Sequence, residues 1–190
     1  MNIPYEKGAF VEYIRKGDQL VVDLFLTAGM NPNVGLIAAA ENGQFEILKA
    51  LFRKGATAEN TEGGEALIAA AADGYADIVK MFLDKGVDVN VRNREGETAL
   101  IAVIGWKDNA TETARLLIDS GADVNEKSRI GQTALISAAY SGNIEIVKML
   151  LEKGADVTVK NKNGATPLSM AKYSRSAEII ELLKNAGAKE

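Results

Sequence analysis

Residues 131–158 read GQTALISAAYSGNIEIVKMLLEKGADVT, two apolar segments with a glycine between them. In the first segment, Thr133 stands where a helix needs an N-cap. The apolar residues that follow have the i, i+3, i+4 spacing of one helical face, namely Leu135, Ala138 and Ala139. Gly142 suits a left-handed turn, and the next apolar stripe consists of Ile146, Val147, Leu150 and Leu151. Gly154 suits the left-handed position after a helix, so this stretch predicts a pair of short helices.

The motif that closes this stretch recurs along the chain. Gly-Ala-Asp-Val begins at Gly121 and again at Gly154, and Gly-Ala recurs after the same interval at Gly187. Upstream, the equivalent glycines are Gly29, Gly55 and Gly86. One helix pair is too small to bury its apolar stripe alone, so this nearly constant spacing predicts a stack of similar units.

These residues resemble the ankyrin repeat, whose first helix opens Thr-Pro-Leu-His and whose second helix runs into Gly-Ala-Asp-Val-Asn. The resemblance is strong over residues 60–188 and weaker over residues 9–59. Thr166-Pro167-Leu168 keeps the opening, whereas alanine replaces the proline at 66, 99 and 134, and isoleucine or serine replaces the histidine at 68, 101, 136 and 169. The resemblance implies an all-α ankyrin-type solenoid of about six stacked helix-turn-helix units with projecting β-turn or hairpin loops.

We expect a single domain over residues 1–190. Residues 1–34 would form an amino-terminal capping unit, residues 35–160 the internal repeats, and residues 161–190 a carboxy-terminal capping repeat. Gly29 is followed closely by Leu36, so the projecting turn should be missing there. The last unit carries polar side chains where inner units carry Ala, Gly or Leu, as a water-exposed terminal face requires; they are Lys172, Arg175, Lys184 and Asn185.

Composition argues against several classes of function. The net charge of −4 disfavours general affinity for nucleic acid or an anionic membrane, and no apolar run is long enough to span a bilayer. Histidine and cysteine are both absent, so the commonest general base and the commonest transition-metal ligands are missing. We expect no cofactor and no metal, and a cytoplasmic location, with a periplasmic or secreted one left open if a signal peptide has been removed.

Catalysis is not expected. No phosphate-binding glycine loop occurs, and a serine or threonine nucleophile would lack a histidine base. Asp88, Asp123 and Asp156 recur once per unit, which indicates a structural role in the turns through local backbone hydrogen bonds. The sequence therefore predicts a protein that is not an enzyme.

The projecting turns carry a repeated pair of cations. Three successive turns each carry two cations at equivalent positions: Arg92, Arg94, Lys127, Arg129, Lys160 and Lys162. The nearby acidic residues are Glu95 and Glu126, so the net charge of this edge is +4. Such a row would favour a partner with an acidic surface, and the attraction would weaken in salt. Ordinary solvated turns are the alternative explanation.

Aromatic residues at the predicted concave helix face are the second candidate for binding. Trp106 lies in a short insertion, and Tyr140 and Tyr173 stand one repeat apart, on the same face of adjacent units. Both residue types are common at contact surfaces. Trp106 could instead fold back over Ile104, and the tyrosines could simply cover neighbouring helices.

Together these features predict a monomeric, non-catalytic protein–protein interaction module that recognises another protein through the concave helix face and the turn tips. Binding would be favoured because the stack fixes the contact residues beforehand. The alternative is a cognate inhibitor or immunity-type subunit that occludes a toxin or an enzyme.

Overall fold

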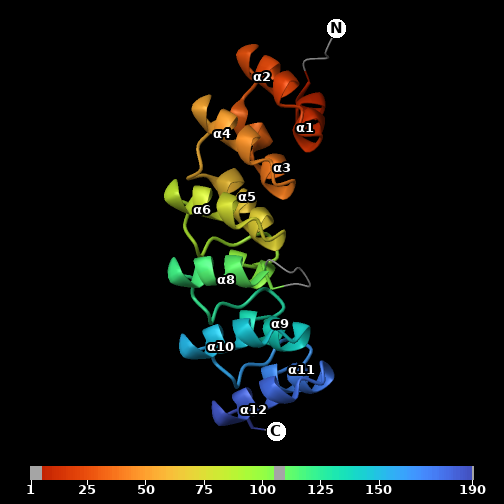
Figure 1. Ribbon diagram of the computed structural model, residues 1–190, viewed down its shortest axis with the longest axis vertical. Coiled ribbons are helices and arrows are strands. Elements are labelled where there is room, and N and C mark those ends of the chain that lie inside the picture. The colour runs from red at the N-terminus through yellow and green to blue at the C-terminus, as the bar shows by residue number, and fades with distance from the viewer. Residues whose placement is uncertain (1–5, 105–109, 190) are drawn as a thin grey trace. The chain divides into compact units, whose positions relative to one another are not determined.

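The computed structural model describes residues 6–104 and 110–189, and its helices group into two compact units, Met1–Asp88 and Val89–Glu190. In the described ranges every regular element is helical and no strand occurs, as the sequence predicts. The α-helices there number twelve and form six successive pairs, and within each unit the pairs pack against one another (Figure 1).

The first unit contains three helix pairs and one 3₁₀ turn. Their bounds are α1 Lys7–Arg15, α2 Gln19–Thr27, η1 Pro32–Gly35, α3 Leu36–Glu41, α4 Phe45–Arg53, α5 Thr61–Ala72 and α6 Ala76–Asp84. The turn η1 runs straight into α3, so the long projecting turn is missing between Gly29 and Leu36 as expected. In its place the side chain of Asn33 accepts the backbone N–H of Thr57 at 2.8 Å, which ties this turn to the next connection.

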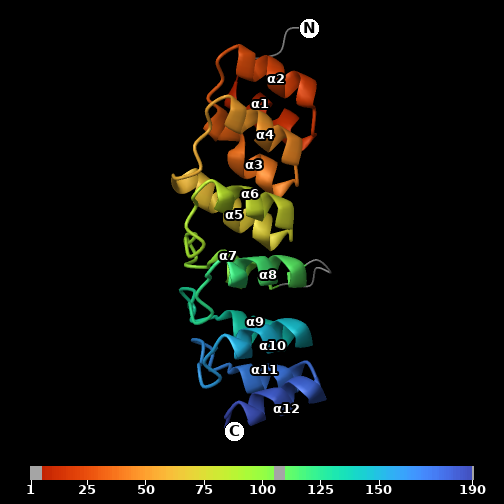
Figure 2. The same ribbon diagram turned by 60° about the vertical axis from the view of Figure 1, so that its left-hand side comes forward.

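The second unit contains the other three pairs. Their bounds are α7 Ala99–Ala102, α8 Ala110–Asp119, α9 Ala134–Ser141, α10 Ile144–Glu152, α11 Pro167–Tyr173 and α12 Ala177–Asn185. The first helices α9 and α11 pack side by side, and so do the second helices α8, α10 and α12. Turns that precede the first helices lie along one side of the unit, which Figure 2 shows next to α7, α9 and α11.

A leucine at the same position of the repeat anchors the core in five of the six helix pairs. Each of these leucines is at most 2% exposed: Leu36, Leu67, Leu100, Leu135 and Leu168. Ala138 and Ala139 are fully buried on α9. Their small side chains let α9 and α11 approach closely, so the stack buries a continuous apolar layer within the unit.

The helix ends agree with the sequence prediction. Thr133 caps α9 by accepting the backbone N–H of Ile136, and Pro167 occupies the first turn of α11, where its missing N–H costs nothing. Gly142 has φ of 74° and Gly154 has φ of 81°, the left-handed conformation that these positions require. These local features follow directly from residue type.

Helix α5 differs from the expected pattern. It begins at Thr61, earlier than the repeat opening with alanine at position 66 implies, because the Asn60 side chain accepts the N–H of Gly63 and caps an additional turn. A Cβ on Gly63 would lie 1.9 Å from the carbonyl oxygen of Ala58. Glycine is therefore required for this close backbone approach, although it is a poor helix former.

Candidate interaction surface

The projecting turns of the second unit are closed by their own hydrogen bonds. Asn93 donates its backbone N–H to the carbonyl of Glu97 at 3.0 Å, and its side-chain oxygen accepts the N–H groups of Glu95 and Glu97. Asn161 repeats this arrangement, and its side chain accepts the N–H groups of Asn163 and Ala165. An asparagine at the base of a turn thus organises the tip from within.

Neighbouring tips are also joined to each other. The backbone N–H of Arg129 donates to the carbonyl of Glu95 at 2.8 Å, and the N–H of Lys162 donates to the carbonyl of Ile130 at 2.9 Å. Each of these bonds links the main chain of one turn to the main chain of the next. Together they fix the positions of three successive tips relative to one another.

A second set of contacts lies in the Gly-Ala-Asp-Val segments that follow the second helices. The Asn90 side chain accepts the N–H of Asp123, and the Asn125 side chain accepts the N–H of Asp156, both at 2.8 Å. Asp123 in turn accepts the N–H of Asn125 at 2.8 Å. The predicted structural role of the recurring aspartates is confirmed for Asp123 and Asp156, and the asparagines supply the contact between repeats.

Asp156 also accepts two hydrogen bonds from Thr158, from its hydroxyl at 2.7 Å and from its backbone N–H at 2.8 Å. These two bonds, with a smaller contribution from the positive charge of Lys127, hold the pKa of the Asp156 carboxyl below its ordinary value. The carboxylate is therefore charged in its role as a turn acceptor.

The six predicted tip cations are not equivalent. Arg92 donates to the carbonyl of Lys127 at 2.9 Å and forms an ion pair with Glu126, so its guanidinium braces two turns against each other. The remaining five side chains are exposed at or beside the tips: Arg94, Lys127, Arg129, Lys160 and Lys162. With Arg92 and Glu126 paired, the exposed charge of the tips comes from these five cations and Glu95.

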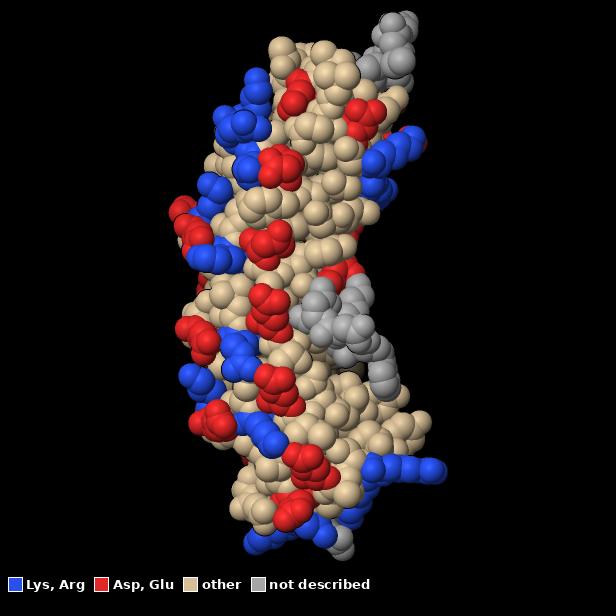
Figure 3. Space-filling view, in the orientation of Figure 1, with Lys and Arg blue, Asp and Glu red and all other residues tan. Residues whose placement is uncertain are grey.

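The charges on the second helices are arranged differently. Arg115 pairs with Glu145, and Lys148 pairs with Glu178 at 2.8 Å, so each basic residue meets the acidic residue of the following helix. Figure 3 shows acidic and basic side chains interspersed over α8, α10 and α12. Opposite charges largely balance on this face, in contrast to the tips.

The structure brings the two predicted tyrosines together. The rings of Tyr140 and Tyr173, at the ends of α9 and α11, stack with centroids 5.4 Å apart and 22° between their planes. Tyr173 remains 70% exposed and Tyr140 38% exposed. The prediction that they share a face is confirmed, and one broad aromatic surface is left open to solvent. Trp106, the third predicted aromatic contact, lies outside the described residues.

Arg175 completes this end of the second unit and was not predicted as a contact residue. It has φ of 57°, the positive value that Gly17, Gly43, Gly74 and Gly142 adopt in the equivalent loops. Among the described residues it is the one non-glycine with positive φ. Left-handed backbone is strained for an L-residue, so this loop geometry costs more with Arg175 than with the glycines of the other repeats.

The described residues hold neither a metal-binding cluster nor a membrane-spanning helix. No group of three or more Asp or Glu side chains is placed to hold a metal ion there. Every helix in the same ranges is too short or too polar to cross a bilayer.

Comparisons with known proteins agree with this geometry. The family model for ankyrin repeats (3 copies) matches four overlapping stretches, at residues 12–93, 36–128, 67–161 and 106–190. A protein of Treponema pallidum (strain Nichols), described as ankyrin repeat-containing, is 35% identical over 110 residues. That match covers 53% of this chain and 37% of the length of the relative.

Proposed function

This chain belongs to the ankyrin-repeat family, and we propose that it acts as a single, non-catalytic protein-binding module whose turn tips recognise an acidic surface on another protein. The observation that carries the proposal is the hydrogen bonding of Arg129 to Glu95 and of Lys162 to Ile130. These main-chain bonds place exposed cations at fixed intervals before any partner arrives.

Preorganisation is the physical advantage of this arrangement. A flexible loop loses conformational entropy when it binds, whereas a tip that is already hydrogen bonded to its neighbour loses less. The backbone at Arg129 and Lys162 does not have to be ordered on binding, because it is already hydrogen bonded to the neighbouring turn. Electrostatic attraction from such a row accelerates association and favours acidic partners.

The stacked tyrosines would supply a second contact. Tyr173 offers a largely exposed ring held in place by Tyr140, so a partner side chain could bury apolar area there without ordering the ring first. Tyrosine and arginine, which both occur here, are among the residue types that dominate binding energy at protein interfaces.

The proposal is tested with immobilised protein. Wild-type chain and the variant Arg94→Glu, Arg129→Glu, Lys162→Glu are exposed to the same lysate, and retained proteins are identified by mass spectrometry. We expect a partner that the wild type retains and the variant loses, and whose retention falls as salt is raised. A matched control reverses Lys49, Lys54 and Lys153, which lie on or just after second helices.

A partner retained equally by both proteins would reject the tips as the binding surface. If the retained partner is an enzyme or a toxin, an activity assay with and without the chain separates tethering from inhibition. Loss of activity would favour the inhibitor alternative over a simple scaffold.

A further inference from the structure

The middle tip of the second unit carries an apolar side chain that recognition by charge does not explain. Ile130 is 55% exposed, and it is one of five large apolar side chains that are exposed among the described residues. The equivalent positions of the neighbouring tips hold Glu95 and Asn163, which are also exposed. Ile130 is therefore an apolar surface at a position where the other two tips are polar.

The turn does not need an isoleucine in order to close. In each tip a glycine donates its backbone N–H to the carbonyl three residues earlier, from Gly96 to Asn93 at 2.9 Å, from Gly131 to Ser128 at 2.8 Å and from Gly164 to Asn161 at 2.9 Å. The turn thus forms in the same way around Glu95 and Asn163 as it does around Ile130. The exposed isoleucine has no role in closing the turn, so its role is sought at the surface.

The backbone that carries Ile130 is held from both sides. The N–H of Arg129 donates to the carbonyl of Glu95 in the preceding tip, and the carbonyl of Ile130 accepts the N–H of Lys162 in the following tip. Isoleucine is branched at Cβ and has few accessible rotamers. A partner that covers Ile130 therefore loses little free energy in ordering either the backbone or the side chain.

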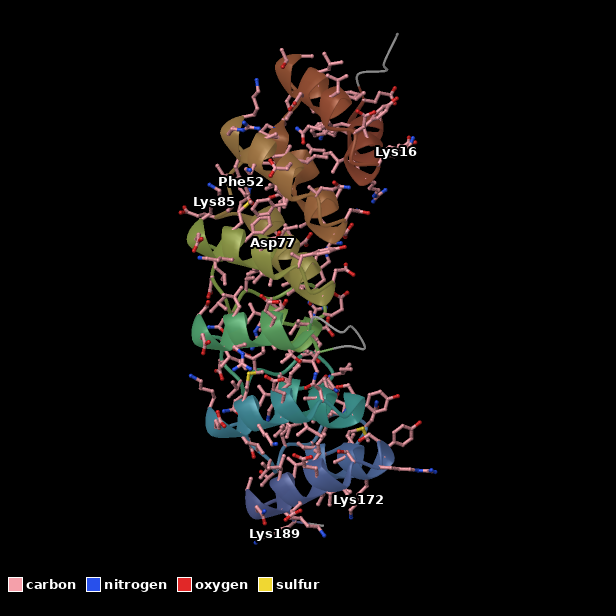
Figure 4. All side chains as sticks on the ribbon, in the orientation of Figure 1. Lys16, Phe52, Asp77, Lys85, Lys172 and Lys189 are labelled. Carbon is pink, nitrogen blue, oxygen red and sulfur yellow. The ribbon has the colours of Figure 1, made fainter. Side chains whose placement is uncertain are left out.

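Two cations lie beside Ile130. Arg129 precedes it in the same tip, and Lys162 is joined to it by the main-chain bond; both side chains are exposed. Neither side chain forms an ion pair or a ring contact within the described part of the chain. Lys85 of the first unit shows the contrast, because its ammonium lies 4.5 Å from the centroid of the Phe52 ring (Figure 4). The charges beside Ile130 are therefore open to carboxylates of a partner.

The combination of charge and apolar surface indicates the kind of partner. Positive charge attracts phosphates and carboxylates alike. A single-stranded nucleic acid gains little from an aliphatic side chain, because its bases bind by stacking on aromatic rings, and the net charge of −4 disfavours a polyanion in general. A protein segment can offer carboxylates and an apolar side chain next to each other, which matches Arg129, Ile130 and Lys162.

We propose that Ile130 is the apolar contact of the tip surface, and that the partner is an acidic protein segment which places an apolar side chain over Ile130 and carboxylates on Arg129 and Lys162. The inference rests on the proposed function and deepens it. Charge alone attracts many acidic proteins, whereas Ile130 selects those that carry an apolar side chain between their carboxylates.

Fluorescence anisotropy with two labelled nonapeptides tests this contact. Both consist of glutamate except at the central residue, which is leucine in one peptide and serine in the other. We expect the wild type to bind the leucine peptide about tenfold more tightly in about 150 mM salt, because leucine buries apolar area on Ile130. The variant Ile130→Asn copies the residue of the next tip and should bind the two peptides with equal affinity.

The control variant is Leu24→Gln, which also replaces an exposed aliphatic side chain by an amide, but on α2 of the first unit. It should keep the preference of the wild type for the leucine peptide. The conservative variant Ile130→Val should keep a preference of at least about threefold, because valine retains most of the apolar surface. Circular dichroism confirms that each variant is folded.

Four results would overturn the proposal. They are equal affinity of the wild type for the two peptides, a preference that Ile130→Asn leaves unchanged, a preference that Leu24→Gln also abolishes, and tighter binding of a single-stranded oligonucleotide of similar charge than of the leucine peptide. Absence of any binding to the leucine peptide counts as equal affinity.

The tip variant Arg94→Glu, Arg129→Glu, Lys162→Glu separates this inference from the proposed function. We expect it to bind both peptides at least about tenfold more weakly than the wild type. If this variant loses its captured partner while Ile130→Asn still prefers the leucine peptide, the role of Ile130 is wrong and the charged module remains. If it keeps its captured partner while Ile130→Asn loses the preference, the apolar contact is supported and recognition by tip charge is rejected.

Discussion

The guanidinium of Arg92 donates a hydrogen bond of 2.9 Å to the carbonyl of Lys127 in the following turn. The same side chain pairs with Glu126, whose side chain is only 22% exposed. The sequence groups Arg92 with five other tip cations as a possible partner contact. Its geometry instead gives it a role in holding two turns together.

Replacing Arg92 should therefore reduce stability. We expect Arg92→Met to lower the free energy of unfolding by about 1 kcal/mol, a modest value because the side chain is partly exposed. Arg129→Met, at an exposed tip position, should change it by less than about 0.5 kcal/mol. Urea denaturation followed by circular dichroism measures both. Equal losses for the two variants would contradict the bracing role of Arg92.

Gly63 and Gly8 both lie in helices, but replacing them by alanine should change the stability of the protein in opposite directions. Gly63→Ala should destabilise the protein by about 1–3 kcal/mol, because the new Cβ would meet the Ala58 carbonyl at 1.9 Å. Gly8→Ala in α1 meets nothing within 4 Å and should stabilise it by up to about 1 kcal/mol through helix propensity. Thermal unfolding of both variants checks the signs, and a stabilising Gly63→Ala would show that α5 does not start at Thr61.

Arg175 and Gly142 form a second pair, at equivalent loop positions with positive φ. Arg175→Gly should raise the free energy of unfolding by roughly 0.5–1 kcal/mol by relieving backbone strain. Gly142→Ala should lower it by about 1 kcal/mol, although a Cβ there has open space, because the strain is in the backbone. Denaturation curves measure both changes in the free energy of unfolding, and two changes of the same sign would contradict this account.

Acid should weaken the turn at Asp156. Its pKa in the folded protein is lower than in the unfolded chain, so the stabilising contribution is present above the unfolded value of about 3.9 and is lost as pH falls through the folded value. The stability difference between the wild type and Asp156→Asn should therefore shrink as pH is lowered below about 4. Denaturation curves at a series of pH values measure this, and a difference independent of pH would contradict it.

Much of the fold was predictable because it depends on local rules. Helix pairs, the cap at Thr133 and the left-handed glycines at 142 and 154 follow from residue type and spacing. The early start of α5 was missed, because Gly63 and Gly64 disfavour a helix and only Asn60 signals a cap. Arg175 was placed among the polar groups of the last unit, but its positive φ is set by the register with Gly142 and not by its own type.

The surfaces were predictable only in part. The regular spacing of the repeats was enough to place Tyr140 beside Tyr173, since equivalent positions in adjacent repeats share a face. The role of Arg92 was not predictable, because it depends on where a carbonyl of the next turn points.

The central claim is that fixed tips recognise an acidic partner by charge. It is tested most directly by measuring the dissociation constant of the captured partner, as a function of salt, for the wild type and for Arg94→Glu, Arg129→Glu, Lys162→Glu. We predict that the wild-type affinity falls steeply between about 50 and about 300 mM salt, and that the variant binds weakly with little salt dependence. Two superimposable salt curves of equal affinity would contradict the claim.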